Sequence, residues 1–434
     1  MTASGGRPSG GRHVVVTGMG IVGGAGIGVE RFTDALRNGR GRFSAVRAAP
    51  SSRPAYVMAE LEPFRLDEHL PSALQAEPSL AARLRKVGGR STRVAQAGLL
   101  AVAQAWCQAG FPAGGERTAL VVGGQNLSHA FEAGWSERFA EEPAYLSPSA
   151  AIQMLDSDLI GCVSEVFGIQ GEGYAVGGAS ASGNVAILNG LRLIRSGDAD
   201  VCVVVGALAE LSPFQLQAFA NLGALGGEAY LDEPERACRP FDRRHNGFIP
   251  GQASACLVLE AESHALARGA PALGRVLGGA MSLDGNRGAN PSVAGEAGVM
   301  RRALANAGVP VDAVEYVNAH GSSSSLGDIT ELQAIERAFG AHGPNVLVNS
   351  TKSISGHCLW SAGVVEALVC LVQINAGFLH GNLNLTEPIE HACALLGPDS
   401  RDIGVRIAMS NSFGFGGINT SLVLASPSLS IGSG

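Results

Sequence analysis

Four short segments of the chain combine glycine with hydroxyl, imidazole or amide side chains, each at the end of an apolar run. They are GGASASG (177–183), NAHGSSS (318–324), STKSISGH (350–357) and NSFGFGG (411–417). Strand ends and helix starts expose backbone N–H groups beside short side chains. Such segments can hold a nucleophile, an acid–base group or an anion.

Ser180 lies in the first segment, between a predicted strand and a predicted helix start. A small hydroxyl side chain there can be exposed with backbone N–H groups nearby, which is the geometry of a nucleophile elbow. A serine in a glycine-rich turn is more often a helix N-cap, so this segment alone leaves both interpretations open.

Two histidines and a lysine lie in the second and third segments. His320 follows the apolar strand EYV, and Lys352 and His357 follow the strand VLVN. An imidazole can transfer protons near neutral pH, but a lone histidine is more often structural or solvated. The fourth segment, around Phe413, can present backbone N–H groups to an anion or form an ordinary turn between strands.

Apolar runs that alternate with helical patterns must position these segments. The first series has predicted strands at 14–22, 118–124, 199–207 and 253–260, and an amphipathic helix at 91–110. A second series begins near residue 275 and ends with a helix at 362–377 and a closing strand at 406–424. The alternation predicts an α/β fold with largely buried sheets, built as one compact unit of two related halves.

Composition limits the class of protein. The 434 residues are 46% hydrophobic and 16% charged, which indicates a large buried interior. The net charge of −7 argues against a general nucleic-acid binder. The eight cysteines are scattered without a CxxC pair and several lie in apolar runs, so we expect reduced core cysteines and neither a zinc site nor a disulfide framework.

The N-terminal segment MTASGGRPSGGRH lacks the apolar region of a signal peptide. No run is expected to reach membrane-spanning length. We therefore expect a cytoplasmic protein with a disordered tail at 1–12 and no membrane contact.

Together, the strings NAHG, STKS…GH and NSFGFGG resemble those of the β-ketoacyl-acyl carrier protein synthases in order and interval. The resemblance runs from residue 14 to about residue 424 and includes CRPFDRRHNGFIPGQASACLVLE (238–260). It implies the thiolase fold, with two pseudo-symmetric halves in a layered α-β-α-β-α arrangement, usually in a homodimer. The expected halves are 13–265, with insertions, and 266–426, followed by a flexible tail at 427–434.

The resemblance implies roles for the reactive side chains. Ser180 stands where the family carries the cysteine that accepts the acyl chain. His320 and His357 match the family's two histidines, and Lys352 matches its supporting lysine. Glu366 matches the carboxylate that commonly holds that lysine.

Other positions are implied in the same way. Asn411 is a further supporting residue, and Phe413 matches a gating aromatic residue. Backbone N–H groups at the nucleophile position and at Phe413 form the family's oxyanion hole. Ser322 and Ser324 stand where threonines usually contact pantetheine. The phosphopantetheine arm would be supplied by the carrier protein, with no cofactor bound by the chain itself.

A serine changes the chemistry that this site can do. A cysteine at a helix start can ionise, whereas a hydroxyl needs a strong base. Ser180 is therefore a poor acyl acceptor unless His320 or His357 activates it. Decarboxylation of a malonyl thioester needs only donors aimed at the thioester oxygen, which the two histidines can supply. The pattern resembles the decarboxylases of polyketide β-branching cassettes, which turn malonyl-carrier protein into acetyl-carrier protein for a hydroxymethylglutaryl-synthase-like partner.

Three other functions are open. A non-catalytic chain-length-factor subunit would also lack the cysteine, but the retained histidines and lysine count against it. A serine-dependent acyltransferase would become esterified at Ser180. An elongating synthase would need the serine to do the work of a thiol.

A carrier protein is typically acidic, so its dock should be locally basic. Arg90 and Arg93 are the candidates for this dock, although an ordinary solvated helix face would show the same charges. They belong to the densest basic cluster of the chain, which comprises Arg83, Arg85, Lys86, Arg90 and Arg93.

Overall fold

The computed structural model describes residues 12–47 and 55–429. The tails predicted at 1–12 and 427–434 fall largely outside these ranges. Of the first tail only Arg12 is described, and it forms an ion pair with Asp200 at 2.5 Å.

Ten strands form two series with the same internal order. In the first series the strands lie side by side as β1-β8-β7-β5-β6, and in the second as β9-β16-β15-β10-β11. Their bounds are β1 (Val14–Gly23), β5 (Thr118–Gly123), β6 (Gly173–Val176), β7 (Val201–Gly206), β8 (Ala253–Ala261), β9 (Gly274–Leu283), β10 (Tyr316–Asn318), β11 (Leu347–Asn349), β15 (Ile407–Gly414) and β16 (Ile418–Ala425).

The strand directions repeat as well. β5 is parallel to β6 and β7, while β8 runs antiparallel to β7 and β1. In the second series β10 is parallel to β11 and β15, while β16 runs antiparallel to β15 and β9. A short antiparallel pairing of β1 with β9 joins the two series. The chain therefore has two pseudo-symmetric halves, as the sequence predicted.

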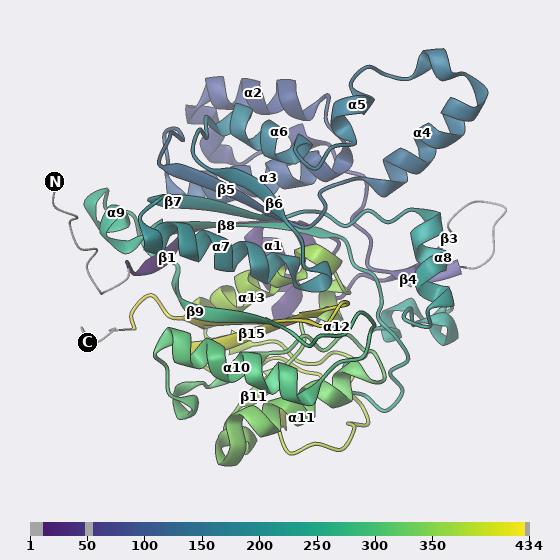
Figure 1. Ribbon diagram of the computed structural model, residues 1–434, viewed down its shortest axis with the longest axis vertical. Helices are drawn as coiled ribbons and strands as arrows, with labels where there is room; N and C mark the ends of the chain where they lie inside the picture. The colour runs from purple at the N-terminus through teal and green to yellow at the C-terminus, as the bar shows by residue number, and fades with distance from the viewer. Residues whose placement is uncertain (1–11, 48–54, 430–434) are drawn as a thin grey trace.

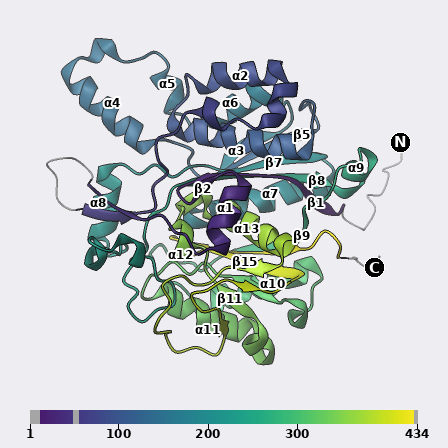
Figure 2. The same ribbon diagram turned by 180° about the vertical axis from the view of Figure 1, so that it is seen from behind.

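Helices complete five layers (Figures 1 and 2). Each series of strands forms one sheet, and the β1–β9 pairing connects the two. Two helices lie between the two sheets, two cover the outer face of the first sheet, and two cover the outer face of the second. They are α7 (Ser182–Ser196) and α13 (Ala362–Ala376), then α3 (Arg93–Ala109) and α6 (Asp158–Phe167), then α10 (Val293–Ala307) and α11 (Gly327–Phe339). This is the α-β-α-β-α layering of the thiolase fold.

Shorter elements fill the connections. They are β2 (Gly26–Ile27), α1 (Val29–Arg37), β3 (Ser44–Arg47), β4 (Ala55–Met58), α2 (Pro78–Gly88), α4 (His129–Glu141), α5 (Ala150–Gln153), α8 (Pro213–Asn221), α9 (Glu262–Ala267), α12 (Lys352–Ser355), β12 (Phe378–Leu379), β13 (Ala394–Leu395) and β14 (Arg401–Asp402).

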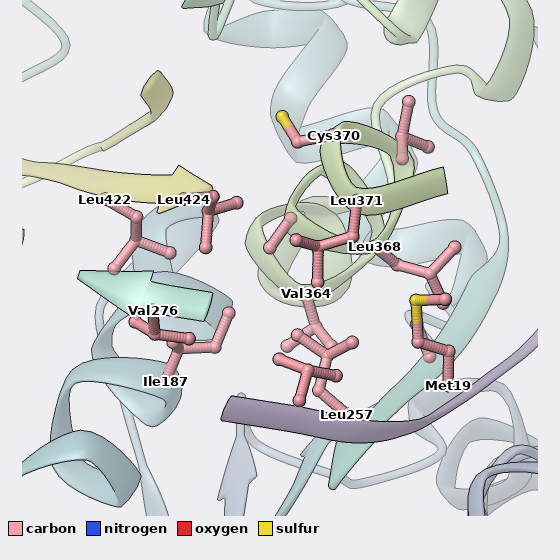
Figure 3. Close-up of a cluster of buried hydrophobic side chains, with 14 of the residues drawn as sticks. Met19, Ile187, Leu257, Val276, Val364, Leu368, Cys370, Leu371, Leu422 and Leu424 are labelled. Carbon is pink, nitrogen blue, oxygen red and sulfur yellow. The ribbon is translucent and has the colours of Figure 1, made fainter. Parts of the chain in front are cut away.

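The middle layer forms the centre of the hydrophobic core. Val364 and Leu371 of α13 lie among side chains of both sheets, such as Leu257 of β8 and Val276 of β9 (Figure 3). One correction to the sequence analysis follows from this helix. The window Leu359–Ala376 has a mean hydropathy of 1.6 over 18 residues, which is long and apolar enough to cross a membrane. Since 89% of the window is buried inside the protein, packing between two sheets accounts for its hydropathy.

Two segments differ from the sequence prediction. The closing strand expected at 406–424 is a hairpin of β15 and β16, because Gly416 and Gly417 adopt φ values of +89° and +69° and reverse the chain. Helix α4, which lies in an arm that projects from the body of the protein, was not predicted from the sequence (Figure 1). None of its residues is buried, so it carries no apolar stripe that marks a packed helix.

Candidate active site

Ser180 lies in a strained turn between β6 and α7. The preceding residue, Ala179, has a φ of +48°, which is uncommon for a residue with a side chain. The N-cap of α7 is Ala181, which makes no side-chain capping bond, so Ser180 is not the cap. The hydroxyl of Ser412 donates to the Ser180 carbonyl oxygen at 3.0 Å and ties the turn to β15. Of the two interpretations left open above, the structure favours the exposed elbow.

His357 contacts Ser180 directly. Its Nε2 atom lies 2.9 Å from the Ser180 Oγ atom, although the two residues are 177 positions apart in the chain. Its Nδ1 atom accepts a hydrogen bond from the backbone N–H of Leu359 at 3.2 Å. An Nδ1 atom that accepts cannot carry the proton, so the neutral ring has its proton on Nε2 and donates it to Ser180.

His320 completes the pair of imidazoles. It follows β10, and the centroid of its ring lies 5.2 Å from that of His357 in an edge-to-face arrangement. The ring of Phe413 lies 5.7 Å away on β15. The Nδ1 atom of His320 is buried and has no partner in the part of the chain that the structure describes.

Lys352 and Glu366 form a buried ion pair behind the histidines. The Lys352 Nζ atom donates to Oε1 of Glu366, and both side chains are almost wholly buried. Burial raises the pKa of Glu366 to about 7. Burial, and then the positive charge of Lys352, hold the pKa values of His320 and His357 well below their usual range. Both imidazoles are therefore neutral near pH 7.

Glu331 is a supporting residue that the sequence analysis missed. Its carboxylate accepts the backbone N–H of His320 at 2.8 Å and that of Gly321 at 2.7 Å. Asn411 donates its side-chain N–H to the same carboxylate at 3.1 Å. Burial raises the pKa of Glu331 to about 7. In the sequence this glutamate lies in the segment TELQAIERAF, which has helical spacing, and a glutamate in such a segment is usually exposed to solvent.

One cavity of about 780 Å³ brings the reactive side chains together. Ser180, His320 and His357 line it with Phe413, which is 8% exposed. Ser322 and Ser324 line it as well, and the Ser322 hydroxyl donates to that of Ser324 at 2.9 Å. Lys352, Glu366 and Asn411 lie behind this wall.

The two arginines predicted for the carrier dock, Arg90 and Arg93, do not line this cavity. Arg93 forms an ion pair with Glu210 at 3.3 Å and donates to the Leu61 carbonyl oxygen, so its charge is used within the chain. Arg90 is exposed after the end of α2. Among residues 12–47 and 55–429, no three His, Cys, Asp or Glu side chains gather as ligands for a metal ion. Six of the eight cysteines are buried, as expected for core residues.

Comparison with known families identifies matches along most of the chain. The family model for the beta-ketoacyl synthase N-terminal domain matches residues 11–265, and that for the C-terminal domain matches residues 273–386. The polyketide biosynthesis malonyl-ACP decarboxylase PksF of Bacillus subtilis (strain 168) is 35% identical over 95% of this chain and 96% of its own. The 3-oxoacyl-[acyl-carrier-protein] synthase 2 of Vibrio harveyi is 32% identical over 95% of this chain and 98% of its own.

Two solved structures share the fold over nearly the whole chain. A β-ketoacyl synthase from Burkholderia phymatum STM815 matches with a TM-score of 0.83 and 29% identity, over 96% of this chain and 99% of its own. The ishigamide ketosynthase/chain length factor also matches with a TM-score of 0.83, at 26% identity, over 96% of this chain and 100% of its own.

Proposed function

The chain belongs to the β-ketoacyl synthase family, and we propose that within it the protein is a decarboxylase that converts malonyl-carrier protein into acetyl-carrier protein. The likeness to a malonyl-ACP decarboxylase, at 35% identity over 95% of the chain, supports this activity. The chain also resembles elongating synthases. The choice between decarboxylation and elongation therefore depends on the chemistry of the site.

The observation that carries the proposal is the hydrogen bond from the Leu359 N–H to Nδ1 of His357, from which the tautomer of the ring follows. Because the Leu359 N–H occupies Nδ1, the Nε2 atom facing Ser180 is a donor and cannot act as a base. The Ser180 hydroxyl therefore lacks the activation that a serine nucleophile needs. The same Nε2–H can donate a hydrogen bond to a substrate oxygen atom and stabilise the negative charge that develops on it. This argues against a serine-dependent acyltransferase and for decarboxylation.

The proposed reaction uses the two imidazoles as hydrogen-bond donors. The malonyl thioester oxygen lies between His320 and His357, while the pantetheine arm follows Ser322 and Ser324 into the cavity. When the bond to the carboxylate carbon breaks, carbon dioxide leaves and its electron pair forms an enolate. A donor aimed at such an oxygen typically contributes about 3–4 kcal/mol. No acyl group is placed on Ser180, so no second chain is joined.

A direct test is to incubate the protein with malonyl-carrier protein and follow the carrier's mass. We expect loss of one carbon dioxide, a rate lower by about 10²–10³-fold in His357→Ala, and a rate within a few-fold of wild type in Ser180→Ala. An unchanged malonyl carrier would refute decarboxylation. A longer acyl product formed on adding an acyl-carrier protein would indicate an elongating synthase.

The partners are part of the same proposal. The relative's name places its activity in polyketide biosynthesis. We infer that the acetyl-carrier product here passes to a hydroxymethylglutaryl-synthase-like enzyme for β-branching. Reconstitution with such an enzyme should yield the branched carrier-bound product only when this protein is present.

Arg90 is the remaining candidate for the carrier dock, since its charge is exposed whereas that of Arg93 is paired. We expect Arg90→Glu to raise KM for malonyl-carrier protein at least several-fold and to leave turnover of a small malonyl thioester unchanged. Lys86→Glu, at an exposed position within α2, is the matched control. An unchanged KM for Arg90→Glu would remove this residue from the dock.

A further inference from the structure

Glu296 is a buried carboxyl group in the cavity to which the steps above give no role. It lies in the first turn of α10, is 1% exposed, and lines the same cavity as Ser180, His320 and Phe413. Its Oε2 atom has no hydrogen-bond partner among the residues that the structure describes. A buried, unpartnered carboxyl destabilises a fold, so packing alone does not explain this residue.

The surroundings of Glu296 favour its acid form. Burial, and then the carboxyl groups of Glu331 and Asp284, raise its pKa well above the usual range. Asp284 lines the cavity too, and its Oδ2 atom is likewise without a partner in the described ranges. Glu296 is therefore a neutral carboxylic acid that can give up a proton when a stronger base enters the cavity.

A decarboxylase needs such an acid. After carbon dioxide leaves, the acetyl enolate must gain a proton at C2, whereas a condensing enzyme would use that carbon to attack an acyl chain. His320 and His357 are neutral and directed to the enolate oxygen in the proposed reaction. Neither carries a spare proton for the carbon. Two acidic residues of the described chain line the cavity with an unpartnered oxygen, and of these Glu296 is buried whereas Asp284 is half-buried.

We propose that Glu296 is a catalytic acid that protonates C2 of the acetyl enolate, an inference that rests on the proposed function. The O–H bond of Glu296 breaks as the new C2–H bond forms, and the enolate electron pair becomes the C–H bond. The resulting carboxylate regains a proton from water that enters the cavity. The balance is malonyl thioester plus one proton giving acetyl thioester plus carbon dioxide.

The test uses the reverse of this proton transfer. An acid that protonates C2 must, as its carboxylate, remove a proton from the acetyl methyl group. Acetyl-carrier protein is incubated with the enzyme in D2O, and the mass of the carrier's acetyl group is followed. We expect deuterium to enter with the wild-type protein and exchange to be slower by about 10²-fold or more in Glu296→Gln.

Two controls keep the result interpretable. Glutamine has the shape of the protonated acid, so Glu296→Gln should fold, and Glu296→Asp should restore part of the exchange. Glu390→Gln alters an exposed glutamate remote in sequence from α10 and should exchange like the wild type. Thermal melting of each variant checks the fold.

The outcomes separate the two proposals. Exchange in Glu296→Gln as fast as in the wild type overturns the role of Glu296. So does a wild-type protein that decarboxylates malonyl-carrier protein but exchanges no deuterium into acetyl. Failure of the wild type to decarboxylate, with exchange that still depends on Glu296, would refute the proposed function and leave Glu296 as the base at that carbon.

Discussion

At the scale of single residues, one hydrogen bond decides what Ser180 can do. The imidazole beside it donates rather than accepts, because a backbone N–H occupies the other ring nitrogen of His357. A serine in this setting resists ionisation, whereas a thiol beside the start of α7 would be favoured as a thiolate. We therefore expect the exchange of sulfur for oxygen at this position to change the chemistry of the site.

Replacing Ser180 with cysteine tests this argument. We expect Ser180→Cys to gain a covalent acyl adduct on incubation with an acyl thioester, because a thiolate attacks without a neighbouring base. Intact-mass measurement detects the adduct, and the wild-type protein should stay unmodified. A wild-type adduct lost in Ser180→Ala would instead favour a serine-dependent acyltransferase.

His380 gives a prediction for stability against pH. It is fully buried, and burial lowers its pKa from 6.5 to about 4. A depressed folded pKa contributes stability that is present above pH 6.5 and is lost as the pH falls toward 4. This group should remove about 3 kcal/mol of unfolding free energy over that window. Urea unfolding from pH 7 to 4 should therefore show a flatter decline for His380→Gln than for the wild type, and parallel curves would contradict the assignment.

At the scale of elements, capping fixes where α3, which covers the outer face of the first sheet, begins. The Thr92 side chain accepts the backbone N–H of Ala95 at 3.3 Å, at the start of α3. Gly110 ends the helix with a φ of +69°. Both signals are local, so the sequence prediction of a helix at 91–110 agrees with the observed Arg93–Ala109.

The cap predicts a stability effect separate from activity. We expect Thr92→Ala to lower the unfolding free energy by about 1 kcal/mol, since it leaves one buried N–H of α3 unsatisfied. Urea denaturation measures the change, and Thr92→Ser should restore most of it. Because Thr92 does not line the cavity of Ser180, turnover of malonyl-carrier protein should stay within error of the wild type.

At the scale of the whole molecule, the first sheet ends in β6, whose outer edge has no neighbour among the described strands. An unpaired strand edge is a template for another chain. The arm around α4 and α5 also exposes a group of large apolar side chains, namely Phe139, Tyr145, Ile152, Met154 and Leu155. Both features favour a homodimer in which β6 and the arm meet a second copy.

We therefore expect the purified protein to sediment as a dimer. Replacing Ile152 and Leu155 with aspartate should shift the equilibrium toward monomer, because the two apolar side chains would no longer be buried on association. Sedimentation velocity at several concentrations measures the shift. A wild-type protein that stays monomeric at high micromolar concentration would contradict the proposal.

The sequence was sufficient for the class of fold and for much of the site. Alternating apolar runs and helical patterns predicted two related α/β halves, because these periodicities are local. Ser180, His320, Lys352 and His357 were candidates because each lies in a short polar string at a strand end or helix start, and the family resemblance then implied their roles.

Tertiary structure decided what those residues can do. The donor role of His357 depends on its contact with a serine 177 positions away, and the role of Glu331 depends on N–H groups that only the folded chain brings to it. Glutamate is usually a surface residue, yet Glu296 is buried and its Oε2 atom has no hydrogen-bond partner among the described residues. Burial and hydrogen-bond partners are set by contacts between distant segments, and they fix where protons reside. That is why the sequence alone could name candidate residues but could not assign their protonation states.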